Sequence, residues 1–294
     1  MKDYVAENER ILNEWCKRFA EDKKDDEAYK GYKIEDYFAK DGIMNIGNKF
    51  KIDDNGTVWR EASGNENKKW NECPLRVLFL TKDENTNDNE AWDVREETFY
   101  AKRYGLPPHN KTMSGSFFYQ NEACLLYGLL NTKSDKMIKY NDFSWERALS
   151  FPNDNIFARI NCKKEVGYST ISDRVLKESI DKYFDYLKEQ ILKIDADILV
   201  CCGSQNDNNI ILNTVYDIYK DEFGYVNCGK SSGMHYNKKR NKLAIDAYHL
   251  AYSIPKCKGS DALEDRYNEI VGMYYEFLKY LKNTNGIDFS ASHR

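Results

Sequence analysis

Four apolar segments of this chain each run directly into a group of polar or ionisable residues. Among the groups are a carboxylate, Asp83, an amide, Asn161, and an imidazole, His249. A carboxylate can stabilise a positive charge or orient a water molecule, and an imidazole can donate a hydrogen bond to a developing negative charge. These residue types are therefore candidates for cleaving a bond whose two ends become oppositely charged.

The four apolar segments have the composition of buried strands. They cover residues 75–80, 156–160, 198–200 and 243–245, and the polar groups that follow begin at Thr81, Asn161, Cys201 and Asp246. The carboxyl ends of parallel strands lie along one edge of a sheet, and ligands bind in the crevice there. We therefore expect the four groups to converge at one edge.

Apolar residues at helical spacing predict long helices between the strands. The expected helices cover residues 3–23, 33–39, 92–104, 117–130, 172–194, 208–223 and 262–281, with a hairpin in 43–61, a loop in 65–72 and a strand in 225–228. Strands that alternate with long helices indicate a three-layer α/β/α fold with a short, mostly parallel, four-stranded central sheet. We expect residues 1–74 to form a helical and hairpin extension packed on a core domain of residues 75–284, followed by a tail of residues 285–294.

Charge and apolar content limit the partners that we expect. The formal net charge is −4, so the whole molecule is not strongly attracted to polyanions. One basic run, residues 238–242, and the pair Lys163-Lys164 could still contact phosphates, although such a run is usually solvated surface. No apolar run approaches the ~20 residues that span a membrane, and residues 1–4 have no apolar signal core. We expect a cytoplasmic protein without a membrane partner.

The eight cysteines do not have the spacing of a metal site. Two are adjacent, at Cys201 and Cys202, and the others occur singly, so no C-x-x-C pair is present to grip one ion. Free cysteines in apolar stretches usually behave as small buried residues. We therefore expect reduced structural cysteines, no metal and no cofactor, with an iron–sulfur cluster built from distant residues as the alternative.

The order of these segments resembles the uracil-DNA glycosylase superfamily over about residues 75–281. Residues 77–85 resemble the first motif of that family, which follows its first core strand, and residues 246–251 resemble the second, which contains a histidine. Residues 114–118 and the leucine-rich segment behind them resemble the loop and buried helix that follow the first motif. The resemblance implies hydrolysis of the N-glycosidic bond of a uracil or modified pyrimidine base that is flipped out of DNA.

The chemistry of the reaction, the local charge and the resemblance together indicate a role for each candidate residue. Asp83 would stabilise the cation on the sugar or orient water, and His249 would donate to the departing base. Asn161 would read the base edge, with Asn85 also contacting the substrate, and Phe117 or Phe118 would stack on the base. DNA would be contacted by the Gly203-Ser204 loop and by basic side chains at Lys163, Lys238, Lys239 and Arg240.

Structural roles compete with these functional ones. Asp83 and its neighbours could form a capping turn, Asn161 could bind strand-end backbone groups, and His249 and the two phenylalanines could belong to the core. The chain also has Thr81 and Glu84 where the first motif of the family usually has Gly and Pro, and Leu250 and Ala251 where the second has Pro and Ser.

Three hypotheses remain from the sequence. The first is a base-excising glycosylase acting on DNA, with Asp83 and His249 as its catalytic residues. The second is a catalytically silent binder of nucleic acid or nucleotides. The third is a small-molecule hydrolase that uses His249 with Ser204 or Cys201, although no G-x-S-x-G elbow or P-loop is present to favour it.

Overall fold

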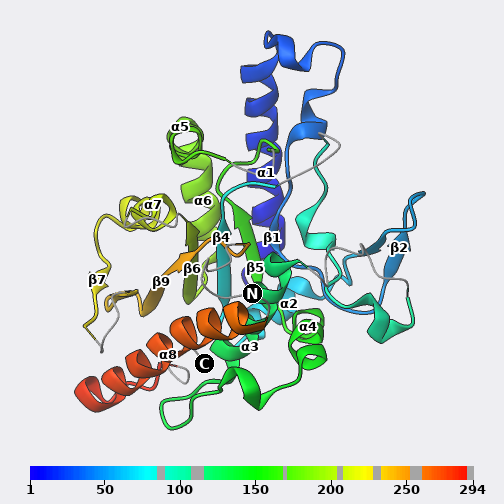
Figure 1. Ribbon diagram of the computed structural model, residues 1–294. Coiled ribbons are helices and arrows are strands. Elements are labelled where there is room, and N and C mark those ends of the chain that lie inside the picture. The colour runs from blue at the N-terminus through cyan, green and yellow to red at the C-terminus, as the bar shows by residue number, and fades with distance from the viewer. Residues whose placement is uncertain are drawn as a thin grey trace.

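The computed structural model describes residues 1–84, 90–106, 116–167, 171–203, 208–227, 233–251 and 260–289, and it has a mixed α/β fold (Figure 1). The α-helices are α1 (Tyr4–Lys23), α2 (Glu66–Glu72), α3 (Phe117–Asn131), α4 (Trp145–Asp154), α5 (Asp173–Lys182), α6 (Phe184–Ile194), α7 (Ile210–Tyr219) and α8 (Ser260–Asn285). The short 3-10 helices are η1 (Glu27–Tyr29), η2 (Ile34–Tyr37), η3 (Val94–Glu96), η4 (Ala101–Tyr104) and η5 (Tyr140–Asp142). The strands are β1 (Gly42–Ile43), β2 (Phe50–Ile52), β3 (Val58–Arg60), β4 (Val77–Thr81), β5 (Ala158–Asn161), β6 (Ile198–Gly203), β7 (Gly224–Tyr225), β8 (Met234–Asn237) and β9 (Lys242–Tyr248).

The central sheet has seven strands in the order β1-β5-β4-β6-β9-β8-β7. Its middle four, β5, β4, β6 and β9, are parallel and arise from the four apolar segments of the sequence. The expected four-stranded sheet was too small, because β1 adds antiparallel to β5 at one edge, and at the other β8 adds antiparallel to β9 and β7 antiparallel to β8. These added strands have two to four residues, which is too short for alternating side chains to show a strand pattern.

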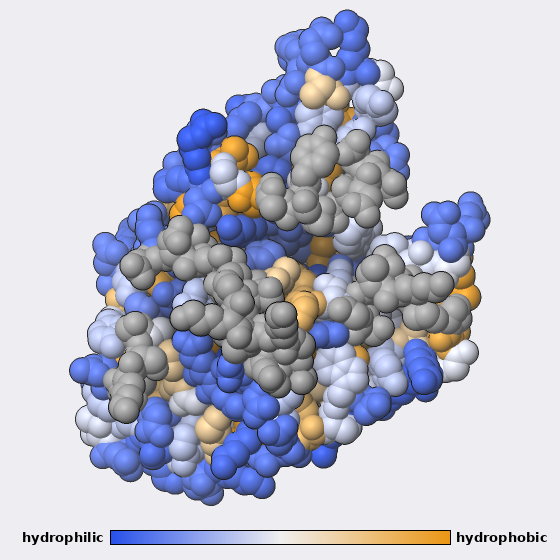
Figure 2. Space-filling model, viewed as in Figure 1, coloured by the Kyte–Doolittle hydropathy of each residue, from blue (hydrophilic) through white to orange (hydrophobic). Residues whose placement is uncertain are grey.

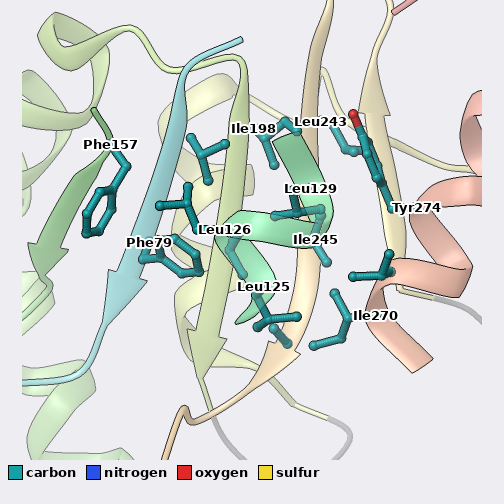
Figure 3. Packing of buried hydrophobic residues seen from close by; sticks show 14 of the residues in the cluster. Phe79, Leu125, Leu126, Leu129, Phe157, Ile198, Leu243, Ile245, Ile270 and Tyr274 are labelled. Atoms are coloured by element: carbon teal, nitrogen blue, oxygen red, sulfur yellow. The ribbon is translucent and has the colours of Figure 1, made fainter. Parts of the chain in front are cut away.

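Helices cover both faces of the sheet, and alternate strand residues face the two layers. Phe79 and its neighbours on one face pack against α3, α4 and α8, whereas Leu78 and Leu80 on the other face pack against α1, α5, α6 and α7 (Figure 1). Figure 3 shows Phe79 and Ile245 beside leucines of α3, with Phe157 on the far side of Phe79 and Ile270 of α8 in the same cluster. The four parallel strands are therefore buried on both sides, as their continuous apolar sequence predicts.

Residues 1–74 contribute to the sheet and to one of its helical layers. Helix α1 begins where Asp3 accepts a hydrogen bond from the Ala6 amide at 3.0 Å, and it buries Trp15 and Phe19 in the layer that contains α5, α6 and α7. Strand β1 then pairs with β5, and β2 and β3 form a separate two-stranded hairpin. The N-terminal residues thus lie against the strand that ends at Asn161.

Three local expectations differ from the structure. Residues 92–104 form two 3-10 turns rather than one helix, and the second ends at Gly105 with φ of +70°. Residues 66–72, expected as a loop, form α2, which buries Trp70. The helix expected over residues 172–194 is broken at Tyr183 into α5 and α6.

Hydrophobic side chains lie mainly inside the molecule. No helix among the described residues is both long enough and apolar enough to cross a membrane. On the face shown in Figure 2, hydrophilic side chains predominate and the hydrophobic ones occur in small groups.

Candidate functional site

The carboxyl ends of the parallel strands form the candidate site, and β4 is the strand at which the order reverses. The chain passes from β4 to β5 on one side, and then crosses to β6 and β9 on the other side of β4. In open α/β sheets, ligands bind outside the strand ends at such a reversal. Lys82 and Asp83 follow β4 directly, so the sheet places them at this point.

The Asp83 carboxylate is buried but poorly paired. Its side chain is 8% exposed, and burial raises the pKa of Asp83 to about 6. The nearest cation is Lys163 Nζ, at 3.8 Å from Oδ2, which is too long for a hydrogen bond. Oδ2 has no hydrogen-bond partner among the described residues. At pH 7 the group is mostly ionised, so the site holds a desolvated carboxylate whose enclosed Oδ2 has no hydrogen-bond partner among the described residues.

Residues 163–167, which follow β5 and which we call the Asp83 wall, lie beside the Asp83 carboxylate. Gly167 lies directly against the carboxylate, because a Cβ atom built on it would be 2.0 Å from Asp83 Oδ2. The Gly167 amide donates to the Glu84 carbonyl at 2.8 Å. Only glycine fits at this position with the carboxylate where it is.

The charge of Lys82 acts on both Asp83 and His249. Its Nζ donates to Asp173 at the start of α5, at 3.1 Å. After the larger effect of burial in each case, the charge of Lys82 contributes to lowering the pKa of Asp83 and of His249. A single cation is therefore close enough to influence both catalytic candidates.

His249 is held as a neutral imidazole. Burial, with the nearby charges of Lys82 and Arg266, lowers its pKa to about 4. The Ala251 amide donates to Nδ1 at 3.3 Å, so the ring proton is on Nε2. Arg266 of α8 donates to the main-chain carbonyl of His249 at 2.6 Å, which fixes the backbone. His249 therefore offers a neutral N–H donor at neutral pH.

Asn161 lies at the end of β5 and pairs in register with Thr81 of β4. The Thr81 hydroxyl donates to Asn161 Oδ1 at 2.6 Å, a distance typical of O–H···O rather than N–H···O bonds. The Asn161 backbone amide donates to Asp41 at 2.8 Å. Within the part of the chain described, Nδ2 makes no hydrogen bond, so this group is the donor that a ligand would meet.

The two candidate phenylalanines begin α3, whose N-cap is Ser116. Both are partly buried, and the Phe118 ring lies 6.0 Å from the His249 ring. The Arg159 guanidinium lies 5.1 Å from the centre of the Phe118 ring, and it is paired in the interior with Glu97 and Glu122. Phe118 therefore lies beside both a buried charge network and His249, whereas Phe117 makes no ring contact among the described residues.

Lys163 and Gly203 lie at the carboxyl edge, but neither is presented to DNA as expected. Lys163 Nζ is buried and donates to the carbonyls of Glu165 and Val166. Gly203 ends β6 beneath Asn209, the N-cap of α7, and a Cβ atom on it would be 1.8 Å from Asn209 Oδ1. Asn85 and Ser204 lie outside the described residues.

The basic run does not join the other candidates. Lys238, Lys239 and Arg240 lie in the turn before β9, whereas the site lies after β9. Seven strand residues at about 3.3 Å each separate the two ends by roughly 20 Å. Lys239 and Arg240 are also paired with Glu222. These three residues therefore lie apart from the other candidates, and their contact with DNA stays a prediction.

Two site residues have roles that the sequence did not indicate. Glu84 is buried, accepts a hydrogen bond from the Trp92 amide at 2.8 Å, and has its pKa raised by burial to about 9. Its carboxyl group is therefore protonated at pH 7. Gly167 could not be recognised from the sequence as a site residue, because its role depends on contact with Asp83, which lies 84 positions earlier in the chain.

Metal and thiol chemistry find no support in the described geometry. No group of three or more His, Cys, Asp or Glu side chains is placed to hold a metal ion within the described ranges. The cysteines described are free, and burial raises the pKa of Cys201 and Cys202. Neither thiol is activated as a nucleophile.

Comparison with protein-family models, with curated proteins and with solved structures finds no match to this chain. The resemblance to uracil-DNA glycosylases therefore stays a prediction from the residues.

Proposed function

We propose that this chain hydrolyses the N-glycosidic bond of a uracil or modified pyrimidine base flipped out of DNA. The observation that carries the proposal is the difference in charge state between Asp83 and His249. Asp83 is ionised and desolvated at neutral pH, whereas His249 is neutral and has its proton on Nε2. Cleavage of this bond needs a negative group near the sugar and a donor near the base.

The reaction follows from these two groups. The bond from C1′ to the base nitrogen breaks, and its electron pair leaves with the base. Asp83 stabilises the positive charge on the sugar and accepts the proton of the water molecule that adds to C1′. His249 Nε2–H donates to the base oxygen, where negative charge develops, and Lys82 lies close enough to favour that charge.

Binding of the base has separate support. Asn161 Nδ2 offers a donor at the end of β5, and the ring of Phe118 lies beside His249. Base–aromatic stacking is typically worth about 1–3 kcal/mol per base, which helps to offset the cost of removing the base from the helix. DNA itself is proposed from the resemblance rather than from a basic surface.

The small-molecule hydrolase is less well supported. Cys201 is buried with its thiol donating to the Leu199 carbonyl, and its raised pKa disfavours the thiolate. Its side chain belongs to the layer opposite the one that contains α3. Cys201 is thus a core residue.

A base-release assay tests the proposal. Oligonucleotides bearing uracil, hypoxanthine or modified pyrimidines are incubated with the protein, and abasic sites are cleaved with alkali. We expect Asp83→Asn and His249→Gln each to reduce release by about 10²–10⁴-fold. Glu222→Gln, which changes a carboxylate at the other edge of the sheet, serves as the matched control and should retain full activity.

Two results would contradict the proposal. Equal release by the wild type and Asp83→Asn would remove Asp83 from the mechanism. No release from any substrate, with a salt-sensitive shift of DNA on a gel, would support a silent nucleic-acid binder instead.

A further inference from the structure

The Asp83 wall is held from behind by residues 37–39 of the N-terminal segment. Phe38 and Glu165 form an antiparallel bridge, the Ala39 amide donates to the Lys164 carbonyl at 2.8 Å, and the Val166 amide donates to the Tyr37 carbonyl at 3.1 Å. The wall is thus paired to the N-terminal segment along one side. On its other side, Gly167 touches Asp83.

The Glu165 side chain adds a second connection. Its Oε1 accepts hydrogen bonds from Tyr29 Oη at 2.5 Å and from Lys23 Nζ at 2.7 Å. Tyr29 lies in η1, and Lys23 is the last residue of α1. These donors, together with the charge of Lys163, lower the pKa of Glu165 although burial alone would raise it. Glu165 is therefore a carboxylate fixed by the N-terminal segment.

Lys163 links this carboxylate to Asp83. Its Nζ lies 4.0 Å from Glu165 Oε2 and 3.8 Å from Asp83 Oδ2. The same Nζ donates to the Glu165 and Val166 carbonyls, so the lysine side chain folds back over its own wall. The position of this cation beside Asp83 therefore depends on the conformation of residues 165–166.

We propose that Lys23 and Tyr29 are positioning residues of the site: they fix Glu165, and through it they hold Lys163 and Gly167 against the Asp83 carboxylate. The N-terminal segment is then part of the active site and not an accessory to it. The function of Asp83 in this inference rests on the proposed glycosidase activity, but the contacts themselves do not.

The proposal has an electrostatic consequence that can be measured. The charged groups that act on Asp83 are Lys163 and Lys82, which favour its ionised form, and Glu165, which opposes it. Lys23 and Tyr29 affect Asp83 indirectly, because they donate hydrogen bonds to Glu165. Asp173 affects it indirectly, because it accepts a hydrogen bond from Lys82. Removing the charge of Glu165 should therefore lower the pKa of Asp83.

The experiment is a titration of the Asp83 carboxyl carbon by NMR in the full-length protein. We expect a midpoint near 6 in the wild type and a decrease of about half a pH unit in Glu165→Gln. Tyr29→Phe keeps the ring and removes one hydrogen bond to Glu165, so a smaller shift is expected. Glu222→Gln removes a carboxylate that also binds two cations, but at the opposite edge, and should leave the midpoint unchanged.

The outcomes separate this inference from the proposed function. Unchanged midpoints in folded Glu165→Gln and Tyr29→Phe would overturn the positioning role, whether or not base release is observed. A shifted midpoint without base release from any substrate would support the positioning role and contradict the glycosidase. If bases are released, the acidic limb of the pH–rate profile should move to lower pH in Glu165→Gln, which loss of stability alone would not produce.

Discussion

Two adjacent lysines each approach a buried carboxylate, and the two pairs differ in how many hydrogen bonds the carboxylate accepts. Lys164 binds Asp41 at 2.5 Å, and both side chains are nearly inaccessible. Asp41 also accepts hydrogen bonds from the Asn161 amide and from Gln190, each at 2.8 Å. Lys163 lies 3.8 Å from Asp83, whose Oδ2 accepts none from the described residues.

The comparison separates a structural ion pair from a candidate functional one. A buried charge that is fully hydrogen-bonded supports the fold, whereas a buried carboxylate with an unpaired oxygen is a candidate functional group. Burial and the presence of a lysine are common to both pairs. The number of hydrogen bonds to the carboxylate is what differs.

The largest effect is expected from breaking the structural pair. Asp41→Ala leaves Lys164 buried without its counter-ion and removes an acceptor from Gln190, so we expect a loss of about 3–5 kcal/mol in the free energy of unfolding. Urea denaturation at pH 7.5 measures this change. A loss below ~1 kcal/mol would show that the Lys164–Asp41 pair does not stabilise the fold more than the Lys163–Asp83 pair does.

Breaking the other pair should affect activity instead of stability. Asp83→Asn removes a charge that burial disfavours, so the folded state should be retained or gain about 1 kcal/mol at pH 7.5. Base release should fall by about 10²–10⁴-fold in the same protein. If urea denaturation shows a loss of several kcal/mol, Asp83 is structural and resembles Asp41.

The pH dependence of stability sharpens the comparison. The pKa of Asp83 is raised from 3.8 to about 6 in the folded protein, so the folded state binds the proton more tightly than the unfolded state. The stability that the protonated group contributes is present below pH 4 and is lost as pH rises through 6. Between pH 4 and 7.5 we expect the wild type to lose about 2–3 kcal/mol relative to Asp83→Asn.

That difference is obtained from urea denaturation of both proteins across the pH range. Titrating groups other than Asp83 are common to both, so they cancel in the subtraction. Parallel curves for the two proteins would mean that Asp83 has an ordinary pKa.

A smaller effect is expected at the contact between the Asp83 wall and the carboxylate. Gly167→Ala places a Cβ atom where Asp83 Oδ2 lies, so the wall must shift at a cost of about 1–2 kcal/mol. Gly272→Ala on α8 is the matched control, because its Cβ atom would meet only Met137 at 3.8 Å. The midpoint temperature of thermal unfolding should fall in Gly167→Ala and should stay the same or rise in Gly272→Ala. Equal changes in the midpoint temperature of the two variants would show that Gly167 is not in tight contact with Asp83.

The sequence predicted the parallel centre of the fold because buried parallel strands have continuous apolar stretches, as in β4 and β6. It did not predict β1, β7 and β8, which are short and obtain their partners only in the folded sheet. The break at Tyr183 was also hidden, because α5 and α6 both place apolar residues at helical spacing.

The candidate site, like the fold, was predicted only in part. Strand ends pointed to Asp83, Asn161 and His249, because position after a parallel strand determines the edge. The same rule places residues 238–240, which precede β9, at the other edge, so their separation from the site could have been predicted from the sequence. The roles of Glu165 and Gly167 depend on contacts between distant segments, which no local pattern records.

The anchoring of His249 by Arg266 has a consequence for the newly made chain. The guanidinium that binds the Tyr248 and His249 carbonyls belongs to α8, and Arg266 follows every other residue of the site in the sequence. Synthesis proceeds from the N-terminus at about 5–20 residues per second. The Asp83 half of the site can therefore form while the chain is still on the ribosome, and the imidazole is fixed in place only after the last helix has emerged.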